Sequence, residues 1–486
     1  MSRAPLILYE LNEVPWRVFD WYAQHRPRSA IATLLAESAC YTTRTRDEGE
    51  LHPWSTWPTL HRGVCNAQHG IFFINQDRRC AAAYPPLWET LAQHGVRVGV
   101  FGSLQSYPAP VASASLPYCF YIPDTFAPSP ETLPPGYRAF QAINLRQTRA
   151  DGAVAGPLRV DGSLLRDIAR LPFIGIRAST FAMLARQLLS ERLNPAYRSR
   201  RAILQAPLAF DVFLHAHRRH RPQFCTFFTN HVAGAMHRCW KAAFPQDFGG
   251  QLKGEDDSFK RDTLLFAMDV ADAQLRELKQ LSDDSGGVLV VATSMGQQAI
   301  ERGAYVGELR LTEPTRMMQA LGFNRPWKDR LAMQPDFNFE FDSSADAESF
   351  IRQARRLRAP SGDSLWQRIR QQGASVNLGM ARPVDVIAEG TVLLDALGTG
   401  QAPARRSLAE LGISVIQRDP GTGYHQPLGA LIWYGGGARS GGQRSEIEST
   451  QVRDMILDAF GVDAAPAPAT LKAGAKATAP TAPLQA

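Results

Sequence analysis

The stretch LHPWSTWPTLHRGVCNAQHGI spans residues 51–71 and holds a hydroxyl residue, Thr56, directly before the pair Trp57-Pro58. The run closes on His69-Gly70-Ile71. A hydroxyl that follows a strand and precedes a helix can act as a nucleophile, with backbone N–H groups of the helix start directed at an oxyanion. From these residues alone, a threonine that merely caps the helix is an equally open interpretation.

Short apolar runs alternate with amphipathic segments around this stretch. Strands are predicted at 5–11, 96–102, 223–231, 287–294 and 429–438, and helices at 14–24, 85–95, 258–281 and 449–462. This alternation indicates an α/β fold with a doubly wound, mostly parallel sheet and helices on both faces. Polar residues stand just after several strands, namely Glu10, Asn12, Asn230, His231 and Ser294. Ligands bind at that carboxyl edge in open α/β sheets, so these residues are site candidates.

The order of motifs resembles the alkaline phosphatase superfamily, specifically its type I phosphodiesterase/nucleotide pyrophosphatase branch. STWPTLHRGVCNAQHGI is similar to the nucleophile segment of that branch, with Thr56 on the nucleophile. Five further segments are similar in the same order: LILYELNEVPW, PPLWETLAQHGVRVGVFG, FFTNHVAGAMHRCW, VLVVATSMGQQ and GYHQPLGALIWYGGGA. The resemblance covers most of 1–120, 223–300 and 420–462, and it implies an alkaline-phosphatase-like domain over residues 1–462.

Several metal ligands that the resemblance implies are replaced in this chain. Such enzymes usually hold two zinc-like ions with Asp and His side chains. The first Asp corresponds to Asn12, with Glu10 and Glu13 close enough to substitute, and the later Asp-His pair corresponds to Ser294-Met295. A neutral hydroxyl and a thioether are poor ligands for such cations, so one ion site is expected to be lost.

The second ion site is partly kept. Its Asp corresponds to Asn230 and its late His to His425, while its middle His falls on Gly234. His237 faces the same way as Asn230 if the segment is helical, and His231 is the competitor. A structural histidine is the alternative for both. We therefore expect at most one divalent ion, zinc or manganese, or none. The candidate ligands are Glu10, Asn12, Asn230, His237 and His425.

The resemblance implies a hydrolase or group transferase acting on a phosphate (or sulfate) ester or diester through a covalent Thr56 intermediate, with a reduced metal site. His425 and His237 are the candidate catalytic bases. The candidate substrate-binding residues are Thr59, His61, Arg62, Asn230 and His231. Two alternatives stay open: a catalytically silent member that binds an anionic ligand or partner, and a metal-independent acyl or carbamoyl transferase in a biosynthetic pathway.

Two regions interrupt the strand–helix alternation, about 104–222 and 303–420, and both are expected to be insertions that form a cap. Residues 463–486 are rich in Ala, Pro and Lys and are expected to be disordered. The basic run HAHRRHR at 215–221 is read as a solvated helix end, with an anion-facing patch as the alternative.

Composition and cysteine spacing indicate the cellular compartment and the class of partner. The 486 residues carry a net charge of +7 that is spread along the chain, and the six cysteines show no metal-binding spacing. These features indicate a reducing compartment, and no apolar run approaches the ~20 residues of a membrane span. We expect a cytoplasmic protein whose partner is a small anionic ester, with neither membrane nor nucleic acid bound. The sequence does not give an oligomeric state.

Overall fold

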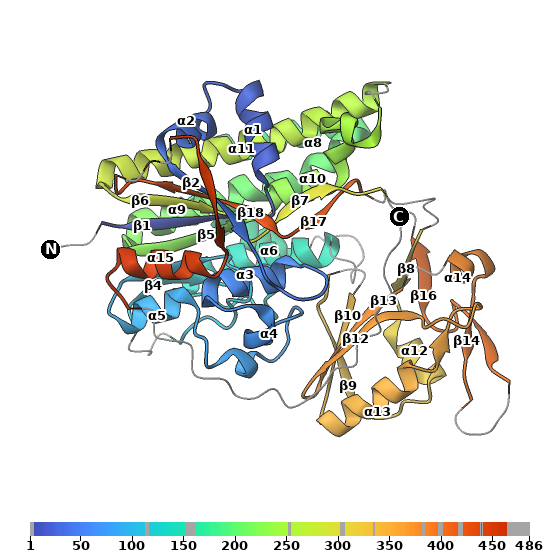
Figure 1. Ribbon diagram of the computed structural model, residues 1–486. Coiled ribbons are helices and arrows are strands. Elements are labelled where there is room, and N and C mark those ends of the chain that lie inside the picture. The colour runs from blue at the N-terminus through green and yellow to red at the C-terminus, as the bar shows by residue number, and fades with distance from the viewer. Residues whose placement is uncertain are drawn as a thin grey trace.

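An eight-stranded sheet forms the centre of the larger of two lobes, with strand order β19-β2-β18-β6-β1-β5-β3-β4 (Figure 1). The computed structural model describes residues 4–111, 116–151, 161–250, 254–301, 307–333, 336–381, 384–396, 402–416, 421–437, 439 and 441–463. The strands are β1 (Leu6–Leu11), β2 (Ala39–Arg44), β3 (Val98–Phe101), β4 (Tyr118–Ile122), β5 (Phe224–Thr229), β6 (Val288–Ala292), β18 (Leu428–Tyr434) and β19 (Arg444–Glu448). All run parallel to β1 except β18, so the predicted α/β, mostly parallel sheet is confirmed.

Side chains of β1 alternate between two apolar layers, as expected for a central strand. Ile7, Tyr9 and Leu11 pack into one core, and Leu6 and Leu8 pack into the other. The first core is covered by α1 (Trp16–His25), α2 (Ala30–Glu37), α9 (Gln205–His220), α10 (His231–Ala243) and α11 (Gly254–Ser285). The second is covered by α3 (Pro53–Arg62), α5 (Leu87–Gln93) and α15 (Gln451–Ala459). Helices therefore cover both faces, which leaves the carboxyl edge of the sheet for a site.

The smaller lobe is a separate α/β unit with its own apolar core (Figure 1). Its main sheet has the order β12-β13-β10-β9, with antiparallel neighbours throughout. Its elements are β8 (Glu308–Leu311), α12 (Pro314–Ala320), β9 (Trp327–Arg330), β10 (Asp336–Phe341), α13 (Ser344–Ala354), β11 (Leu357–Arg358), β12 (Trp366–Gln372), β13 (Ser375–Met380), α14 (Val384–Glu389), β14 (Thr391–Leu394), β15 (Ala404–Ser407) and β16 (Ile413–Ile416).

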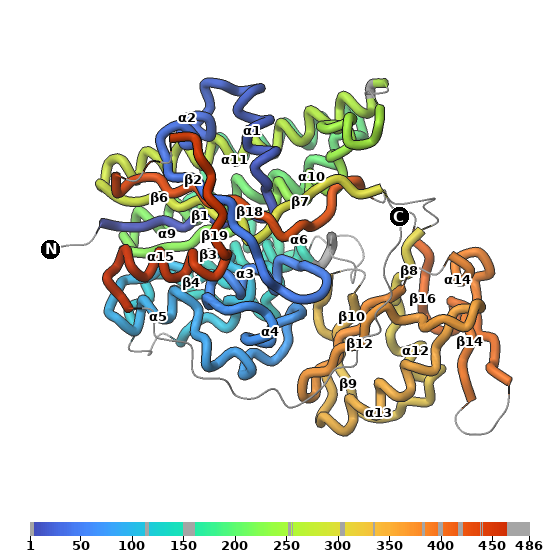
Figure 2. Tube along the Cα trace, in the orientation of Figure 1, coloured from blue at the N-terminus to red at the C-terminus, as the bar shows by residue number. Residues whose placement is uncertain are grey.

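The chain enters and leaves the smaller lobe beside the sheet edge of the larger one (Figure 2). It leaves after β7 (Gly296–Ala299) and returns at β17 (Gly423–Gln426), and these two strands pair antiparallel. The segment expected as an insertion at 303–420 is therefore a lobe carried on a two-stranded stem. Because β7 follows β6 directly, the stem places this lobe beside the candidate site.

Residues 104–222 differ from the expected insertion, because they are not inserted over their whole length. β4 lies at the edge of the central sheet, and α9 packs Phe210 and Phe213 against Phe227 of β5. The prolines around β4 hid this short strand in the sequence pattern. The remaining helices of the region are α6 (Arg138–Asp151), α7 (Gly162–Arg170) and α8 (Ala178–Leu193). The expected disordered tail lies outside the described residues from 464 onward.

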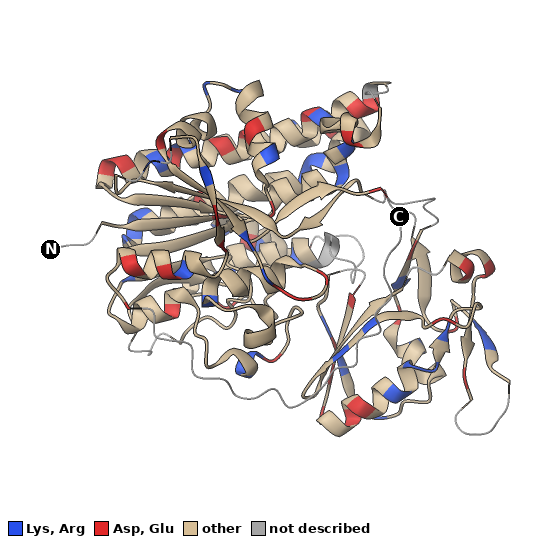
Figure 3. Ribbon diagram, viewed as in Figure 1, with Lys and Arg blue, Asp and Glu red and all other residues tan. Residues whose placement is uncertain are grey.

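Charged side chains of both signs are interspersed along α11 and α13 in the view of Figure 3. The basic run at 215–221 ends α9, where cations are favoured by the helix dipole, and Arg218 lies 3.8 Å from Glu277. That placement agrees with the interpretation of the basic run as a solvated helix end.

Within the described residues, none of the helices has the length and apolar character needed to cross a bilayer.

Candidate functional site

Helix α3 holds Thr56 in its first turn, next to the end of β6. Thr56 is fully buried, and its Oγ1 lies 2.7 Å from Oγ of Ser294. Each hydroxyl can donate to the other. This hydrogen bond joins α3 to a residue just after the end of β6.

Two tryptophans fix the start of α3. The Trp57 indole N–H donates to Oδ1 of Asn12 at 2.8 Å, and the Trp54 indole N–H donates to the Phe72 carbonyl at 3.1 Å. Pro58 cannot donate to the Trp54 carbonyl, since it lacks an N–H. That carbonyl accepts from the Gln105 side chain at 3.4 Å instead. The W-x-x-W-P pattern thus braces the helix that carries Thr56.

The closing HGI supports α3 from the opposite side. His69 Nδ1 accepts from the Ile71 N–H at 3.0 Å, so its Nε2 carries the proton and donates to Thr59 Oγ1, also at 3.0 Å. Thr59 in turn donates to Asp47 at 2.6 Å. Burial, followed by repulsion from Arg62, lowers the pKa of His69 to about 3 and keeps the ring neutral. Thr59, a predicted substrate-binding residue, is committed to this chain of hydrogen bonds.

Glu13, His237 and His425 form the one cluster of three or more potential metal ligands found in the described part of the chain. Their ligand atoms all lie within 4.8 Å of one another. Glu13 Oε2 is 3.1 Å from His237 Nε2 and 3.4 Å from His425 Nε2. Glu13 follows β1, His237 lies on α10, and His425 lies on β17. Three segments that are remote in sequence therefore meet at the carboxyl edge of the sheet.

The backbone of Glu13 is held in the left-handed region, with φ of 63°. This conformation is uncommon for residues other than glycine, and such outliers cluster at functional sites. The Glu13 side chain is 2% exposed, and its carboxylate also accepts from Asn12 at 2.8 Å and from Gln297 at 2.5 Å. The turn thus directs a buried carboxylate at two imidazoles.

The distances from Glu13 to the two histidines are compatible with one tetrahedral metal ion. Zinc–ligand bonds of about 2.0–2.1 Å in a tetrahedron separate neighbouring ligand atoms by ~3.3 Å, close to both Glu13 distances. His237 Nδ1 donates to the Gly423 carbonyl at 2.8 Å, which leaves Nε2 to face the cluster. An outer hydrogen bond of this kind orients metal-binding histidines in proteins.

The charges of the cluster also support a paired state without a metal. Burial alone would raise the pKa of Glu13, but the charges and hydrogen bonds of His425 and His237 hold it well below its usual value. Burial alone would lower the pKa of His425, but Glu13 raises it above 6.5. The carboxylate is therefore ionised, and it favours a positive charge on the His425 ring.

Glu10, predicted as a metal ligand, lies outside this cluster. Its Oε1 is 2.7 Å from His61 Nε2, and both side chains are buried. Glu10 shares the β1 face of Leu6 and Leu8, which looks toward α3, so its carboxylate points away from α10 and β17. His61, predicted to bind substrate, is its partner in this internal pair.

Three other predicted site residues are Asn12, Asn230 and His231, and each has hydrogen-bond partners within the fold. The Asn12 amide donates to Asn230 Oδ1 at 2.6 Å beside the cluster, so these two amides adjoin it without adding charge. His231 is buried: its Nδ1 pairs with the Thr229 hydroxyl at 2.7 Å, and its Nε2 with the Ala267 carbonyl at 3.0 Å. Burial lowers the pKa of His231 to about 4, and with both nitrogens engaged it supports the fold.

Arg62 points to a different region of the larger lobe. Its guanidinium donates to the carbonyls of Ala81 and Tyr84, and it lines a cavity with Trp88 and Tyr121. Burial and the nearby Arg78 lower its pKa to about 10. Arg62 was predicted to bind substrate at the Thr56 site, but the structure gives it contacts that hold the 81–84 turn.

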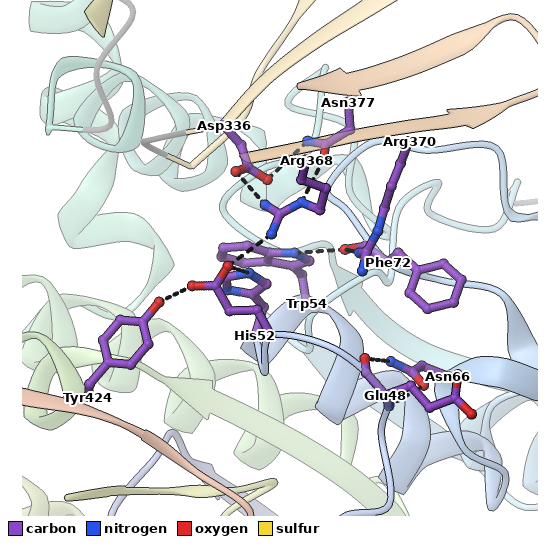
Figure 4. A network of polar contacts seen from close by, with 11 residues as sticks. Glu48, His52, Trp54, Asn66, Phe72, Asp336, Arg368, Arg370, Asn377 and Tyr424 are labelled. Carbon is purple, nitrogen blue, oxygen red and sulfur yellow. Dashed lines mark hydrogen bonds and ion pairs between the residues drawn. The ribbon is translucent and has the colours of Figure 1, made fainter. Parts of the chain in front are cut away.

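The loop before α3 contacts the smaller lobe (Figure 4) and also borders His425 of the cluster. The His52 ring stacks on Trp54 at 4.4 Å between centroids and meets the His425 ring edge-on at 5.8 Å. Glu50 accepts from the Tyr424 hydroxyl and lies 2.9 Å from Arg368 of β12. Burial alone would raise the pKa of Glu50, but His52, Tyr424 and Arg368 lower it below its usual range.

The predictions of candidate site residues missed several of these groups. Glu13 was considered only as a substitute, since nothing in the pattern shows that the turn after β1 adopts positive φ. Gln297 was unnamed, although it lies two residues after Met295. Glu50, His52 and Arg368 were unnamed because their meeting depends on how the smaller lobe docks.

Comparison with known proteins gives distant structural similarities only. Neither a protein-family model nor a curated protein sequence matches the chain. An inactive variant of murine ectonucleotide pyrophosphatase/phosphodiesterase 5, in complex with AMP, aligns with 9% identity and a TM-score of 0.40. The alignment covers 95% of this chain and 96% of that chain. The human protein of the same name aligns with 8% identity and a TM-score of 0.39 over the same shares. Phosphonoacetate hydrolase from Sinorhizobium meliloti aligns with 12% identity and a TM-score of 0.40 over 94% and 96%. At this level of similarity we base no argument about activity on these proteins.

Proposed function

We propose that this chain is a hydrolase or group transferase that acts on a phosphate or sulfate ester or diester through a covalent Thr56 intermediate. One observation carries the proposal: a buried carboxylate and two histidines meet at the carboxyl edge of the sheet, within one hydrogen-bond network with α3. Asn12 links α3 to the cluster of Glu13, His237 and His425, because it accepts from Trp57 and donates to Glu13.

Each residue of the site has a role in this proposal. Glu13, His237 and His425 would hold one divalent ion, zinc or manganese, which supplies Lewis-acid stabilisation of charge on the transferring group. The neutral amides of Asn12 and Asn230 adjoin the cluster without repelling an anionic ester. Thr56 Oγ1 forms the bond to phosphorus or sulfur while the bond to the ester oxygen breaks, and the hydroxyl proton of Thr56 ends on the departing oxygen. Water or an alcohol then releases the transferred group and returns a proton to Oγ1.

The second candidate function is a catalytically silent protein that binds an anionic ligand. A specific observation favours it: Thr56 is fully buried, and Ser294 already satisfies its hydroxyl. Catalysis requires the substrate to reach this buried oxygen, whereas binding of an anion does not.

Turnover assays with the purified full-length protein separate the two candidates. The substrates are 4-nitrophenyl phosphate, bis(4-nitrophenyl) phosphate and 4-nitrophenyl sulfate, each assayed with zinc, with manganese and with chelator. The proposal expects turnover of at least one ester and a Thr56 adduct in intact-protein mass spectra. Loss of both in Thr56→Ala and their return in Thr56→Ser would support the nucleophile. If the wild-type protein binds phosphate but turns over none of the three esters, the binding function is favoured.

A further inference from the structure

The smaller lobe turns a polar sheet face toward the larger lobe (Figure 4). Arg368 and Arg370 lie two residues apart on β12, so their side chains share this face. Asn377 of β13 and Asn338 of β10 are buried there, and Asn377 donates to Asn338 at 2.8 Å. Asn338 donates across the interface to the Ile74 carbonyl at 2.7 Å. A sheet face buried against another lobe is usually apolar, whereas this face carries hydrogen-bonding side chains.

Arg368 is fully neutralised at this face. Its guanidinium contacts Asp336 at 2.6 Å within the smaller lobe and Glu50 at 2.9 Å in the larger lobe. Two carboxylates therefore contact one guanidinium, and this group of three side chains carries a net negative charge.

Arg370 has no comparable partner. Its guanidinium lies 4.6 Å from the centroid of the Phe72 ring, and Nη1 lies 3.5 Å from the Phe72 carbonyl. Among the residues that the structure describes, it forms no ion pair. It is half-buried, and burial together with repulsion from Arg368 lowers its pKa. Asp336 and Glu50 attract Arg370 only at longer range, so a half-buried guanidinium without a carboxylate in direct contact among the described residues gains from an added anion.

A series of contacts connects Arg370 to the candidate site. The Phe72 carbonyl that it approaches is the acceptor of the Trp54 indole, and Trp54 stacks on His52 beside His425. Its Nη2 would lie 3.2 Å from a Cβ added to Gly49, in the loop that carries Glu50 and His52. The guanidinium is therefore presented to the same loop that borders the Glu13 cluster.

We propose that Arg370 binds an oxyanion of the substrate (a phosphate, sulfate or carboxylate group), so that the smaller lobe supplies a specificity-determining residue to the site of the larger lobe. The planar guanidinium offers paired donors that match the oxygens of such groups. The inference deepens the proposed function, because it assigns to the substrate an anionic group that contacts the second lobe.

Isothermal titration calorimetry of the full-length protein with inorganic phosphate tests this assignment. Arg370→Gln should weaken phosphate binding at least about tenfold, since a hydrogen bond to a charged group is lost. Arg370→Lys keeps the charge but loses the paired N–H donors of the guanidinium, so its phosphate affinity should lie between those of the wild type and Arg370→Gln. Arg405→Gln is the matched control, because Arg405 lies in the same lobe, exposed and paired with Glu389. It should bind phosphate like the wild type.

Thermal unfolding separates binding from structure, and the calorimetric assay separates binding from catalysis. Unliganded Arg370→Gln should melt at or slightly above the wild-type temperature, because repulsion from Arg368 is removed and no counter-charge is left unpaired. Phosphate binding is measured without any ester turnover, so failure of the proposed reaction leaves this inference standing. The assignment is overturned if Arg370→Gln binds phosphate like the wild type, if Arg405→Gln weakens binding equally, or if Arg370→Gln melts several degrees lower.

Discussion

Glu13 Oε2 lies 3.1 Å from Nε2 of His237, a histidine whose Nδ1 lies 2.8 Å from the Gly423 carbonyl. A carbonyl only accepts, so Nδ1 carries a proton. Nε2 therefore faces the carboxylate either as the second N–H of an imidazolium or as a lone pair with a cation between them. A neutral imidazole in direct contact would oppose two lone pairs. The relationship makes Glu13 the residue on which the charge of the cluster depends.

Glu13→Gln should reduce zinc uptake at least about tenfold, because the only carboxylate in the three-ligand set is removed. Glu10→Gln is the matched control: Glu10 is three residues earlier and equally buried, but it faces His61. Elemental analysis after dialysis against zinc measures both variants. The wild type should hold at most one ion per chain. Equal zinc content in Glu13→Gln and wild type, or a larger loss in Glu10→Gln, would contradict the assignment.

Two of the candidate histidines, His425 and His231, should separate in the same assay. His425→Gln should lose metal, since His425 Nε2 faces Glu13 at 3.4 Å. His231→Gln should retain metal but lower the free energy of unfolding by about 1–3 kcal/mol, because the buried Thr229 hydroxyl and Ala267 carbonyl lose partners. Thermal unfolding and elemental analysis of both variants check this contrast. Metal loss in His231→Gln with retention in His425→Gln would reverse the roles.

The sequence predicted the sheet well because its signals are local. The buried runs of β1, β5 and β6 and the amphipathic pattern of α11 each identify an element without reference to the rest of the chain. β2, β4 and β19 were not predicted. In the case of β4, five residues between proline-rich loops carry little periodicity. The region 303–420 was expected as an insertion, but the antiparallel pairing of its short strands was not predicted.

Site residues were predictable where they follow a strand and not where a turn redirects them. Asn12 and Asn230 lie at strand ends, and the structure places them in contact. Glu10 and Glu13 were indistinguishable by type and position, yet strand alternation sends one toward α3 and the left-handed turn sends the other toward α10. His231 and His237 were likewise equivalent candidates until their hydrogen-bond partners were known.

Thr56→Ala should abolish turnover if Thr56 is the nucleophile, and it should cost about 1–2 kcal/mol of stability because Ser294 loses its buried partner. Ser294→Ala should cost a similar amount, since it leaves the Thr56 hydroxyl unpaired. Activity distinguishes the pair: Ser294→Ala keeps the nucleophile and should retain measurable turnover. Chemical denaturation and ester assays measure both effects. A Thr56→Ala variant with near-wild-type turnover would rule out the covalent intermediate.

Arg368→Gln should destabilise the contact between the lobes, because it leaves Glu50 and Asp336 without their shared cation. Arg368 is 15% exposed, so we expect a loss of about 1–3 kcal/mol at pH 7, as for hydrogen bonds to charged groups. Arg358→Gln is the control in the same lobe. Its pair with Asp395 is 47% and 30% exposed and should contribute less than about 1 kcal/mol.

The acid dependence of that loss has a definite sign. Contacts with His52, Tyr424 and Arg368 hold the pKa of Glu50 below the usual 4.5 in the folded protein. A carboxyl with a depressed pKa contributes stability above its unfolded value, and that contribution is lost as the pH falls through its folded value. The gap between wild type and Arg368→Gln should therefore be widest above about pH 5 and should narrow on acidification below 4.5. Unfolding free energies from pH 3 to pH 8 measure it. A gap that widens at low pH would show that Glu50 and Arg368 do not stabilise one another.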